Sequence, residues 1–186
     1  MADMHLSDVM NGRPDTTGRT AREIAVYDYL DALSIPYRVV FHDTAETMEA
    51  CEAIDECLGV KMCKNLFLTN RQQTDFYLLL MPGDKPFKTK ELSGQLGVAR
   101  LSFGSGEQME QYLGLLPGSV SVMGLMNDKT HTVRLLIDKD LLNDDELGAH
   151  PCINTASLAI SIGDLVHKFL PATGHTPTAV TLVGEC

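Results

Sequence analysis

The stretch CKNLFLTNRQQTDFYLLLM, residues 63–81, decides the fold. Two apolar runs, 63–69 and 75–81, enclose the polar segment 70–74, and each run has the length and the apolar and aromatic content of a strand. A connection this short joins antiparallel neighbours, so the stretch predicts a β-hairpin. Pro82 follows and ends the second strand.

Helices and further strands flank this hairpin on both sides. Thr20 and Glu23 have the spacing of a capping box, and helical periodicity follows them until Pro36. Further expected helices span 45–58, 88–96, 105–113, 141–147 and 161–169, and further expected strands span 37–42, 132–138 and 153–160. These elements mix without a strict strand–helix–strand alternation. We therefore predict an α+β fold, with a mixed, mostly antiparallel β-sheet or barrel and surrounding helices.

One domain accounts for the chain, which has 186 residues. We expect residues 20–170 to form it, residues 1–19 to be a flexible leader, and residues 171–186 to be a loosely structured tail. The leader is polar and lacks the apolar segment of a secretory signal, so the default location is the cytoplasm. No apolar run approaches the roughly 18 to 20 residues of a membrane-spanning helix, so we expect no membrane partner.

Charge is distributed unevenly along the chain. The formal net charge is −10, which opposes non-specific attachment to nucleic acid and argues against DNA as a partner. Residues 61–100 nevertheless carry a net charge of +4, from Lys61, Lys64, Arg71, Lys85, Lys88, Lys90 and Arg100 against three acidic residues. One basic segment on an acidic body suits a small anionic partner, although a solvated face of clustered lysines has the same composition.

The cysteines and histidines show no metal-binding spacing. The chain has five cysteines, an odd number, and Cys51, Cys57 and Cys63 recur every six residues instead of at the short gap of a zinc site. We expect neither a disulfide framework nor a metal. Motifs for nucleotide phosphates, dinucleotides, zinc proteases and serine hydrolases do not occur, and we expect no cofactor.

Three short segments carry polar groups that suit a site. Lys64 and Asn65 stand at the start of the first hairpin strand, where polar residues fit best if they face a cleft. The loop Gly118-Ser119-Val120-Ser121 combines a flexible glycine with hydroxyl donors. His150-Pro151 is followed by Asn154-Thr155, and in an extended chain His150 and Asn154 share a face. Taken singly, each segment also fits a surface lysine, an ordinary turn or a structural histidine.

In combination, the three segments resemble the YbaK/ProX superfamily of trans-acting editing deacylases, whose fold recurs in the insertion domain of bacterial prolyl-tRNA synthetase. That family has a lysine on a central strand, then a G-S-V-S loop, then a His-Pro segment with Asn-Thr, in this order. The resemblance covers residues 20–170, and the Lys-Asn-Leu-Phe-Leu stretch is similar to the alanine-editing ProX branch. Val122-Met123 departs from the proline that usually follows the loop, which affects the expected shape of the pocket.

The resemblance implies hydrolysis of mischarged Ala-tRNA(Pro), with release of alanine and free tRNA(Pro). It implies catalytic roles for Lys64, Asn65 and His150. It implies substrate binding by Gly118, Ser119, Val120, Ser121, Asn154 and Thr155. The implied partner is the acceptor end of the tRNA, with prolyl-tRNA synthetase as a further candidate. Editing of a cysteinyl- or seryl-tRNA, or binding of an amino acid or nucleotide without catalysis, are the alternatives.

Overall fold

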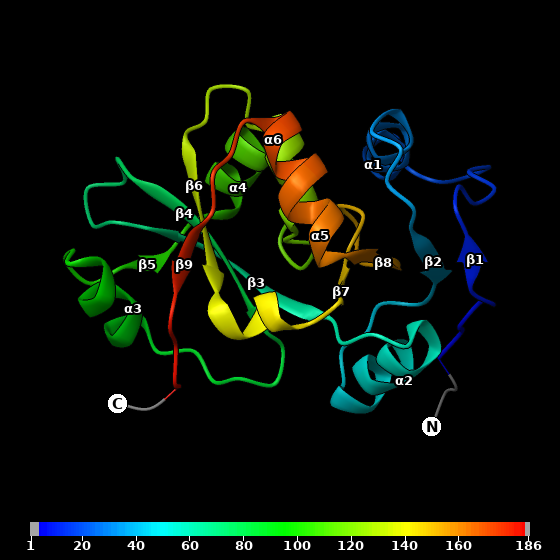
Figure 1. Ribbon diagram of the computed structural model, residues 1–186, viewed down its shortest axis with the longest axis horizontal. Helices are drawn as coiled ribbons and strands as arrows, with labels where there is room; N and C mark the ends of the chain where they lie inside the picture. Colours follow the sequence, from blue (N-terminus) through cyan, green and yellow to red (C-terminus); the bar gives the residue numbers. More distant parts are fainter. Residues whose placement is uncertain (1–3, 185–186) are drawn as a thin grey trace.

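The hairpin lies at the centre of a five-stranded sheet. The computed structural model describes residues 4–184, and in it β3 (Cys63–Thr69) pairs antiparallel with β4 (Phe76–Pro82), as predicted. β5 (Ser102–Phe103), β6 (Val133–Asp138) and β9 (Thr178–Val180) complete the order β5-β3-β4-β6-β9 (Figure 1). β6 lies parallel to both β4 and β9, so this sheet is mixed.

A second, four-stranded sheet is antiparallel throughout. It has the order β1-β2-β8-β7, from β1 (Met10–Asn11), β2 (Arg38–Phe41), β7 (Glu146–Ala149) and β8 (Ala156–Ser161). The two sheets meet where the Gly148 amide donates to the Lys61 carbonyl oxygen at 3.1 Å. A Cβ at Gly148 would lie 2.6 Å from the sulfur of Met62 and 3.2 Å from the Lys61 carbonyl oxygen, so the lack of a side chain at Gly148 favours this approach. The start of β3 and the end of β7 are thereby held together.

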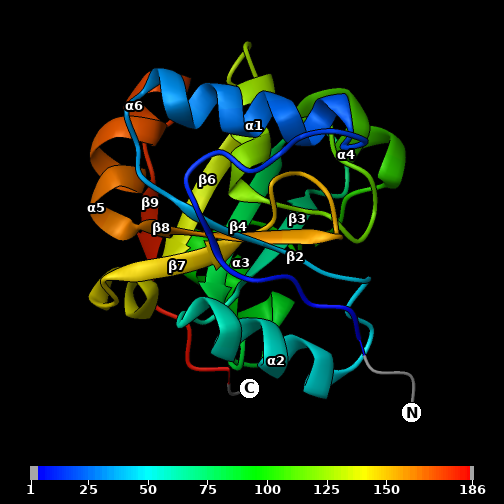
Figure 2. The ribbon, with the colours of Figure 1, turned by 90° about the vertical axis from the view of Figure 1, so that its right-hand side faces the viewer.

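α1 (Ala21–Ala32) and α2 (Met48–Leu58) cover opposite faces of the second sheet (Figure 2). α1 buries Tyr27 and Leu30 in the main core, while Ile54 and Leu58 of α2 pack in a separate cluster. α2 begins at Thr47, whose hydroxyl accepts from the Ala50 amide, and ends at Gly59 in the left-handed conformation.

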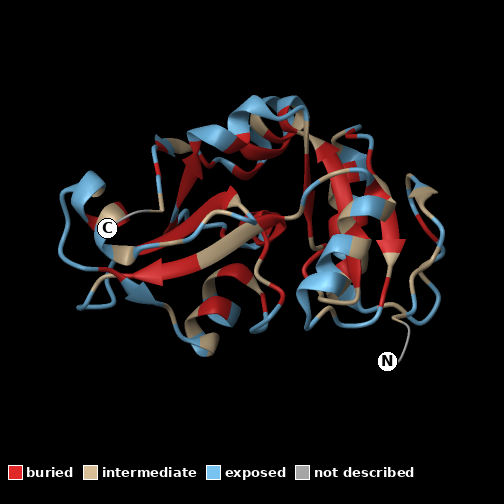
Figure 3. Cartoon of the chain, turned by 90° about the horizontal axis from the view of Figure 1, so that it is seen from below, coloured by how far each residue is buried: buried red, intermediate tan, exposed pale blue. Residues whose placement is uncertain are grey.

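The remaining helices are short. They are α3 (Thr89–Leu96), α4 (Gly106–Leu113), the 3₁₀ turns Val122–Asn127 and Lys139–Asn143, and α5 (Ile162–Asp164), which continues through a π turn, Leu165–Phe169, into α6 (Leu170–Thr173). Buried residues concentrate on the strands and on the inner faces of the helices (Figure 3). The α+β prediction is confirmed, and the described residues form two sheets, not a closed barrel. No helix among residues 4–184 is long and apolar enough to span a membrane.

Three expectations about local structure were wrong. The segment expected as a flexible leader packs against the second sheet from residue 4 onward, through β1 and through the Ser7 amide, which donates to the Phe41 carbonyl at 2.9 Å. In the expected tail, β9 adds a parallel strand beside β6. The helix expected over 141–147 is a 3₁₀ turn followed by β7. Each segment forms a strand that is stabilised by pairing with another part of the chain, and local periodicity does not report that pairing.

Candidate functional site

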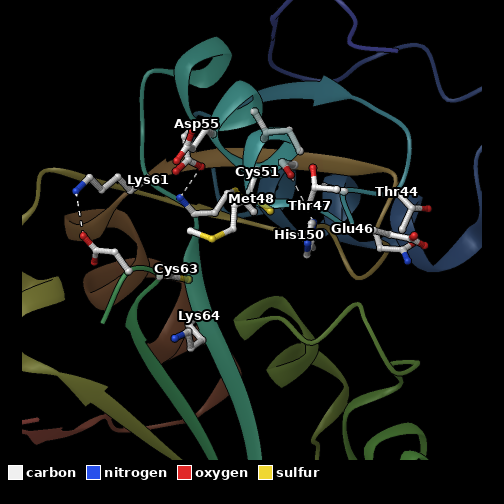
Figure 4. A pocket seen from close by; sticks show the side chains of 18 of the residues that line it. Thr44, Glu46, Thr47, Met48, Cys51, Asp55, Lys61, Cys63, Lys64 and His150 are labelled. Atoms are coloured by element: carbon white, nitrogen blue, oxygen red, sulfur yellow. Dashed lines mark hydrogen bonds and ion pairs between the residues drawn. The ribbon is translucent and has the colours of Figure 1, made fainter. Parts of the chain in front are cut away.

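A cavity of about 940 Å³ opens where the two sheets meet (Figure 4). One wall comes from the segment leading into α2 and from α2 itself, with Met48 and Cys51 at the surface. The start of β3 and the turn at Gly83 and Asp84 form a second wall. The close approach of β3 and β7 therefore places groups from both sheets around one space.

Four of the nine residues expected at the site line this cavity. They are Lys64, Gly118, His150 and Asn154, which come from three separate parts of the chain. The loop containing Gly118 lies against the His150 segment, because a Cβ at Gly118 would lie 3.7 Å from the Asn154 side-chain nitrogen. Gly118 has φ of 87°, a conformation that favours glycine.

Lys64 brings a positive charge to the cavity. Its side chain is half-buried, and its Nζ donates to the Lys85 carbonyl oxygen at 2.8 Å. It makes no ion pair with any residue in 4–184. An ammonium group has three donors, so Lys64 retains hydrogen-bonding capacity for an anionic or polar ligand.

The backbone sets the tautomer of His150. Its Nδ1 lies 2.8 Å from the Ala156 carbonyl oxygen, which can only accept, so Nδ1 carries the proton and Nε2 of the neutral ring carries a lone pair. Burial lowers the pKa of His150, and the nearby His42 lowers it further, against the raising effect of the Ala156 carbonyl. The ring is therefore neutral at pH 7 and offers an acceptor at the cavity.

His42 and Ser157 support His150 and were not predicted from the sequence. His42 is buried, and its Nδ1 lies 2.7 Å from the Asp43 carbonyl oxygen, so its Nε2 accepts from the Ser157 hydroxyl at 2.8 Å. The same hydroxyl oxygen lies 3.4 Å from His150 Nδ1. His42 precedes His150 by more than a hundred positions, and no local pattern joins them.

The other five expected residues lie around the cavity without lining it. Asn65 turns toward Cys63, donating to its carbonyl oxygen at 3.3 Å and its sulfur at 3.2 Å. Asn65 Oδ1 is buried and has no partner among the described residues. The contact with Cys63 holds the Asn65 side chain against β3, outside the lining of the cavity.

The remaining loop residues hold backbone. Ser119 donates to the Leu116 carbonyl at 2.8 Å, and Ser121 donates to the His150 carbonyl at 2.6 Å. Val120 packs against the main core. The Thr155 carbonyl accepts from the His42 amide at 3.0 Å. These contacts position the loop and the His150 segment.

The wall formed by α2 was also missed. Ile54 gives it an apolar surface that Met62 and Cys63 continue at the start of β3, and Asp55 adds a half-buried carboxylate that accepts from the Met62 amide at 3.0 Å. Burial raises the pKa of Asp55. Within residues 4–184 no group of three or more histidine, cysteine, aspartate or glutamate side chains could hold a metal ion.

Comparison with known proteins identifies the family. The family model described as "Aminoacyl-tRNA editing domain" matches residues 42–168, well over half of the chain. The chain is 35% identical over 158 residues to the "Prolyl-tRNA editing protein ProX" of Acetoanaerobium sticklandii, covering 85% of this chain and 96% of that protein. It is 28% identical to "Prolyl-tRNA synthetase associated domain-containing protein 1" of Danio rerio, covering 83% and 84%.

The fold agrees with this assignment. A solved structure titled as a candidate trans-editing enzyme for prolyl tRNA synthetase superposes with a TM-score of 0.64 at 16% identity, covering 88% of this chain and 98% of that one. An identity this low bears on the fold alone, whereas the family model spans the segments that supply the lysine, the glycine loop and the histidine of the cavity. This chain belongs to the aminoacyl-tRNA editing domain family and is a deacylase of the YbaK/ProX type.

Proposed function

We propose that this protein hydrolyses mischarged Ala-tRNA(Pro) in trans, releasing alanine and free tRNA(Pro). The observation that carries the proposal is the convergence of Lys64, Gly118 and His150 on one cavity. The bacterial relative is named a prolyl-tRNA editing protein, which supports tRNA(Pro) as the tRNA of the substrate. Charging of tRNA takes place in the cytoplasm, and we propose that the protein acts there, with prolyl-tRNA synthetase as the enzyme whose errors it corrects.

The reaction needs no covalent intermediate, because an aminoacyl ester is already activated. A water oxygen attacks the carbonyl carbon, the carbon–oxygen bond to the ribose breaks, and the ribose hydroxyl leaves with a proton. In our proposal His150 Nε2 accepts the hydrogen bond of that water and takes its proton. Lys64 holds the phosphate or ribose of the terminal adenosine.

The backbone and amide groups around the cavity complete the proposed site. Backbone amides near Gly118 stabilise the developing oxyanion, and Asn154 orients the aminoacyl group. Asn65, Ser119, Val120, Ser121 and Thr155 support the walls of the cavity, and we propose no direct contact between them and the reacting atoms.

Selectivity in this proposal is steric. A synthetase site shaped for proline rejects the smaller alanine weakly, because a missing apolar group changes binding by only about 1 to 3 kcal/mol. A second, narrower site accepts alanine and excludes proline. The side chains of Met48, Ile54 and Met62 line the cavity beside α2 and are our candidates for the wall that sets this size.

A deacylation panel tests the proposal. Purified protein is incubated with alanyl-, cysteinyl-, seryl- and prolyl-tRNA, and loss of each ester is followed with the enzyme-free rate subtracted. We expect rapid loss of alanine from tRNA(Pro) and slow loss of proline. Faster loss of cysteine or serine than of alanine would identify a different aminoacyl substrate. Ligand binding with no deacylation of any charged tRNA would show a binding role instead of catalysis.

A further inference from the structure

The segments next to α3 and β5 carry an aromatic pair and exposed basic side chains. Phe103, on β5, is 62% exposed, although aromatic residues bury much apolar area when they can. Phe87 lies edge-on to it, with ring centroids 6.2 Å apart. Lys88 and Lys90 follow Phe87 in the sequence and Arg100 precedes Phe103, and all three basic side chains are exposed. We call these five residues the Phe103 surface.

The Phe103 surface lies on the same face of the sheet as Lys64. Lys64, Leu66 and Leu68 alternate along β3 and therefore project to one face. Phe103 is paired directly opposite Leu68, and opposed residues of an antiparallel pair project to the same side. Lys64 and Phe103 thus project from the same face of the sheet, and between them Leu66 and Leu68 pack with Phe87 in one apolar cluster.

The chain between β4 and α3 connects the cavity to this surface. Gly83 and Asp84 line the cavity, and the Lys85 carbonyl accepts from Lys64. Phe87 is two residues beyond Lys85, a span of at most about 7 Å for an extended chain, and its ring centroid lies 6.2 Å from that of Phe103. A ligand held at Lys64 can therefore reach Phe103 within a few nucleotides.

Charge on the Phe103 surface is not neutralised by the protein. Lys88, Lys90 and Arg100 take part in no ion pair and no side-chain hydrogen bond within residues 4–184. The neighbouring carboxylates have other partners: Glu91 accepts from the Val183 and Gly184 amides, and Asp84 pairs with Lys61 at 3.5 Å. Three cations without ion-pair partners among the described residues therefore lie in the chain segments next to Phe87 and Phe103, on a chain whose net charge is −10.

We propose that the Phe103 surface binds the single-stranded 3′ end of the tRNA, with a base stacked on Phe103 and phosphates contacting Lys88, Lys90 and Arg100. This inference rests on the proposed function, because the esterified end must lie in the cavity. Single-stranded RNA is recognised by stacking of unpaired bases on aromatic rings and by cations along the backbone. Exposed phenylalanine with unpaired basic side chains supplies both.

Two substrates separate this surface from the cavity. The first is full-length Ala-tRNA(Pro), and the second is alanine esterified to adenosine, which is too short to reach Phe103. For Phe103→Ala we expect kcat/KM on the tRNA to fall about 5- to 100-fold, the range for loss of one base–aromatic stack. Its rate on alanyl-adenosine should stay within about twofold of the wild-type rate. Phe103→Trp retains a stacking face and should preserve turnover of the tRNA.

The cations are tested by the salt dependence of binding. Affinity for uncharged tRNA(Pro) is measured by fluorescence anisotropy at several salt concentrations. Changing Lys88 or Arg100 to glutamine should lower the log–log slope by about 0.7 for each phosphate that the side chain no longer neutralises, the value for single strands. Lys129→Gln is the matched control, an exposed lysine in the turn before β6, and should leave the slope unchanged.

The outcomes distinguish the two proposals. Wild-type protein that hydrolyses neither ester contradicts the proposed function, and the anisotropy series still decides the surface. Turnover by the wild type with unchanged tRNA binding in Phe103→Ala and Arg100→Gln overturns the surface alone. Variants that lose activity only when prolyl-tRNA synthetase is present would identify a protein-docking surface and would also overturn RNA binding here.

Discussion

Replacing His150 tests the chemistry proposed for the cavity. Because Nδ1 is bound to the Ala156 carbonyl, only Nε2 of the neutral ring remains to accept from water. Acid–base catalysis by a positioned side chain contributes about 10²- to 10⁴-fold. We expect His150→Ala to lower the single-turnover rate on Ala-tRNA(Pro) by about 100- to 1,000-fold, or about 2.7 to 4 kcal/mol of transition-state stabilisation.

The pH dependence gives a second measure of the same group. Burial lowers the pKa of His150 below its ordinary value of about 6.5, so the neutral form predominates at pH 7. We expect the wild-type rate to be constant from pH 7 to 8 and to fall on acidification, with a midpoint below 6.5. Below that midpoint each pH unit should lower the rate about tenfold, because only the unprotonated Nε2 accepts. The acid limb should be absent in His150→Ala.

A matched variant controls for folding. His150→Asn places an amide donor near the position of Nδ1, where it can still bind the Ala156 carbonyl, and removes the acceptor at Nε2. We expect this variant to unfold at the wild-type denaturant concentration and to be as slow as His150→Ala. A wild-type rate in His150→Asn, or an acid limb that persists without the imidazole, would refute the role assigned to Nε2.

Three further outcomes are expected. Lys64→Ala should slow deacylation at least about 100-fold with the fold retained, a loss of about 2.7 kcal/mol, and near-normal turnover would remove the ammonium group from the mechanism. Lys85→Met should lower the free energy of unfolding by about 3 to 5 kcal/mol in urea titrations, because Lys85 donates to Asp138 at 2.6 Å and this carboxylate is 1% exposed; a decrease under about 1 kcal/mol would contradict this. Burial lowers the pKa of His42, so the unfolded chain binds a proton that the folded chain does not, and stability should fall as pH drops below about 6.5, by up to about 1.4 kcal/mol per pH unit. His42→Gln should flatten this dependence, and an unchanged slope would assign it to other groups.

Local signals in the sequence predicted the elements that surround the cavity. Apolar content and a polar turn predicted β3 to the residue and β4 to within one position, because a buried hairpin must carry that pattern. Thr20 begins α1 and Ser105 begins α4 with a complete capping box. Gly59 ends α2 in the left-handed conformation.

Predictions failed where a competing side chain or a strand partner outside the local pattern decided the structure. Thr20 accepts from the Glu23 amide as expected, but the Glu23 carboxylate binds Arg19 and Tyr27 instead of completing the box. β1 and β9 were missed because two- and three-residue strands carry no periodicity of their own.

The amino-acid sequence alone determined the α+β class, the central hairpin and the three segments that carry Lys64, Gly118 and His150, because propensity, caps and motif spacing are local properties. Only the tertiary structure decided which of these residues share a cavity. Asn65 is adjacent to Lys64 yet does not line the cavity, and His42 lies far along the chain yet supports His150. The physical reason is that strand alternation and the close approach of the two sheets at Gly148 set side-chain direction and proximity, and both depend on contacts between residues remote in the chain.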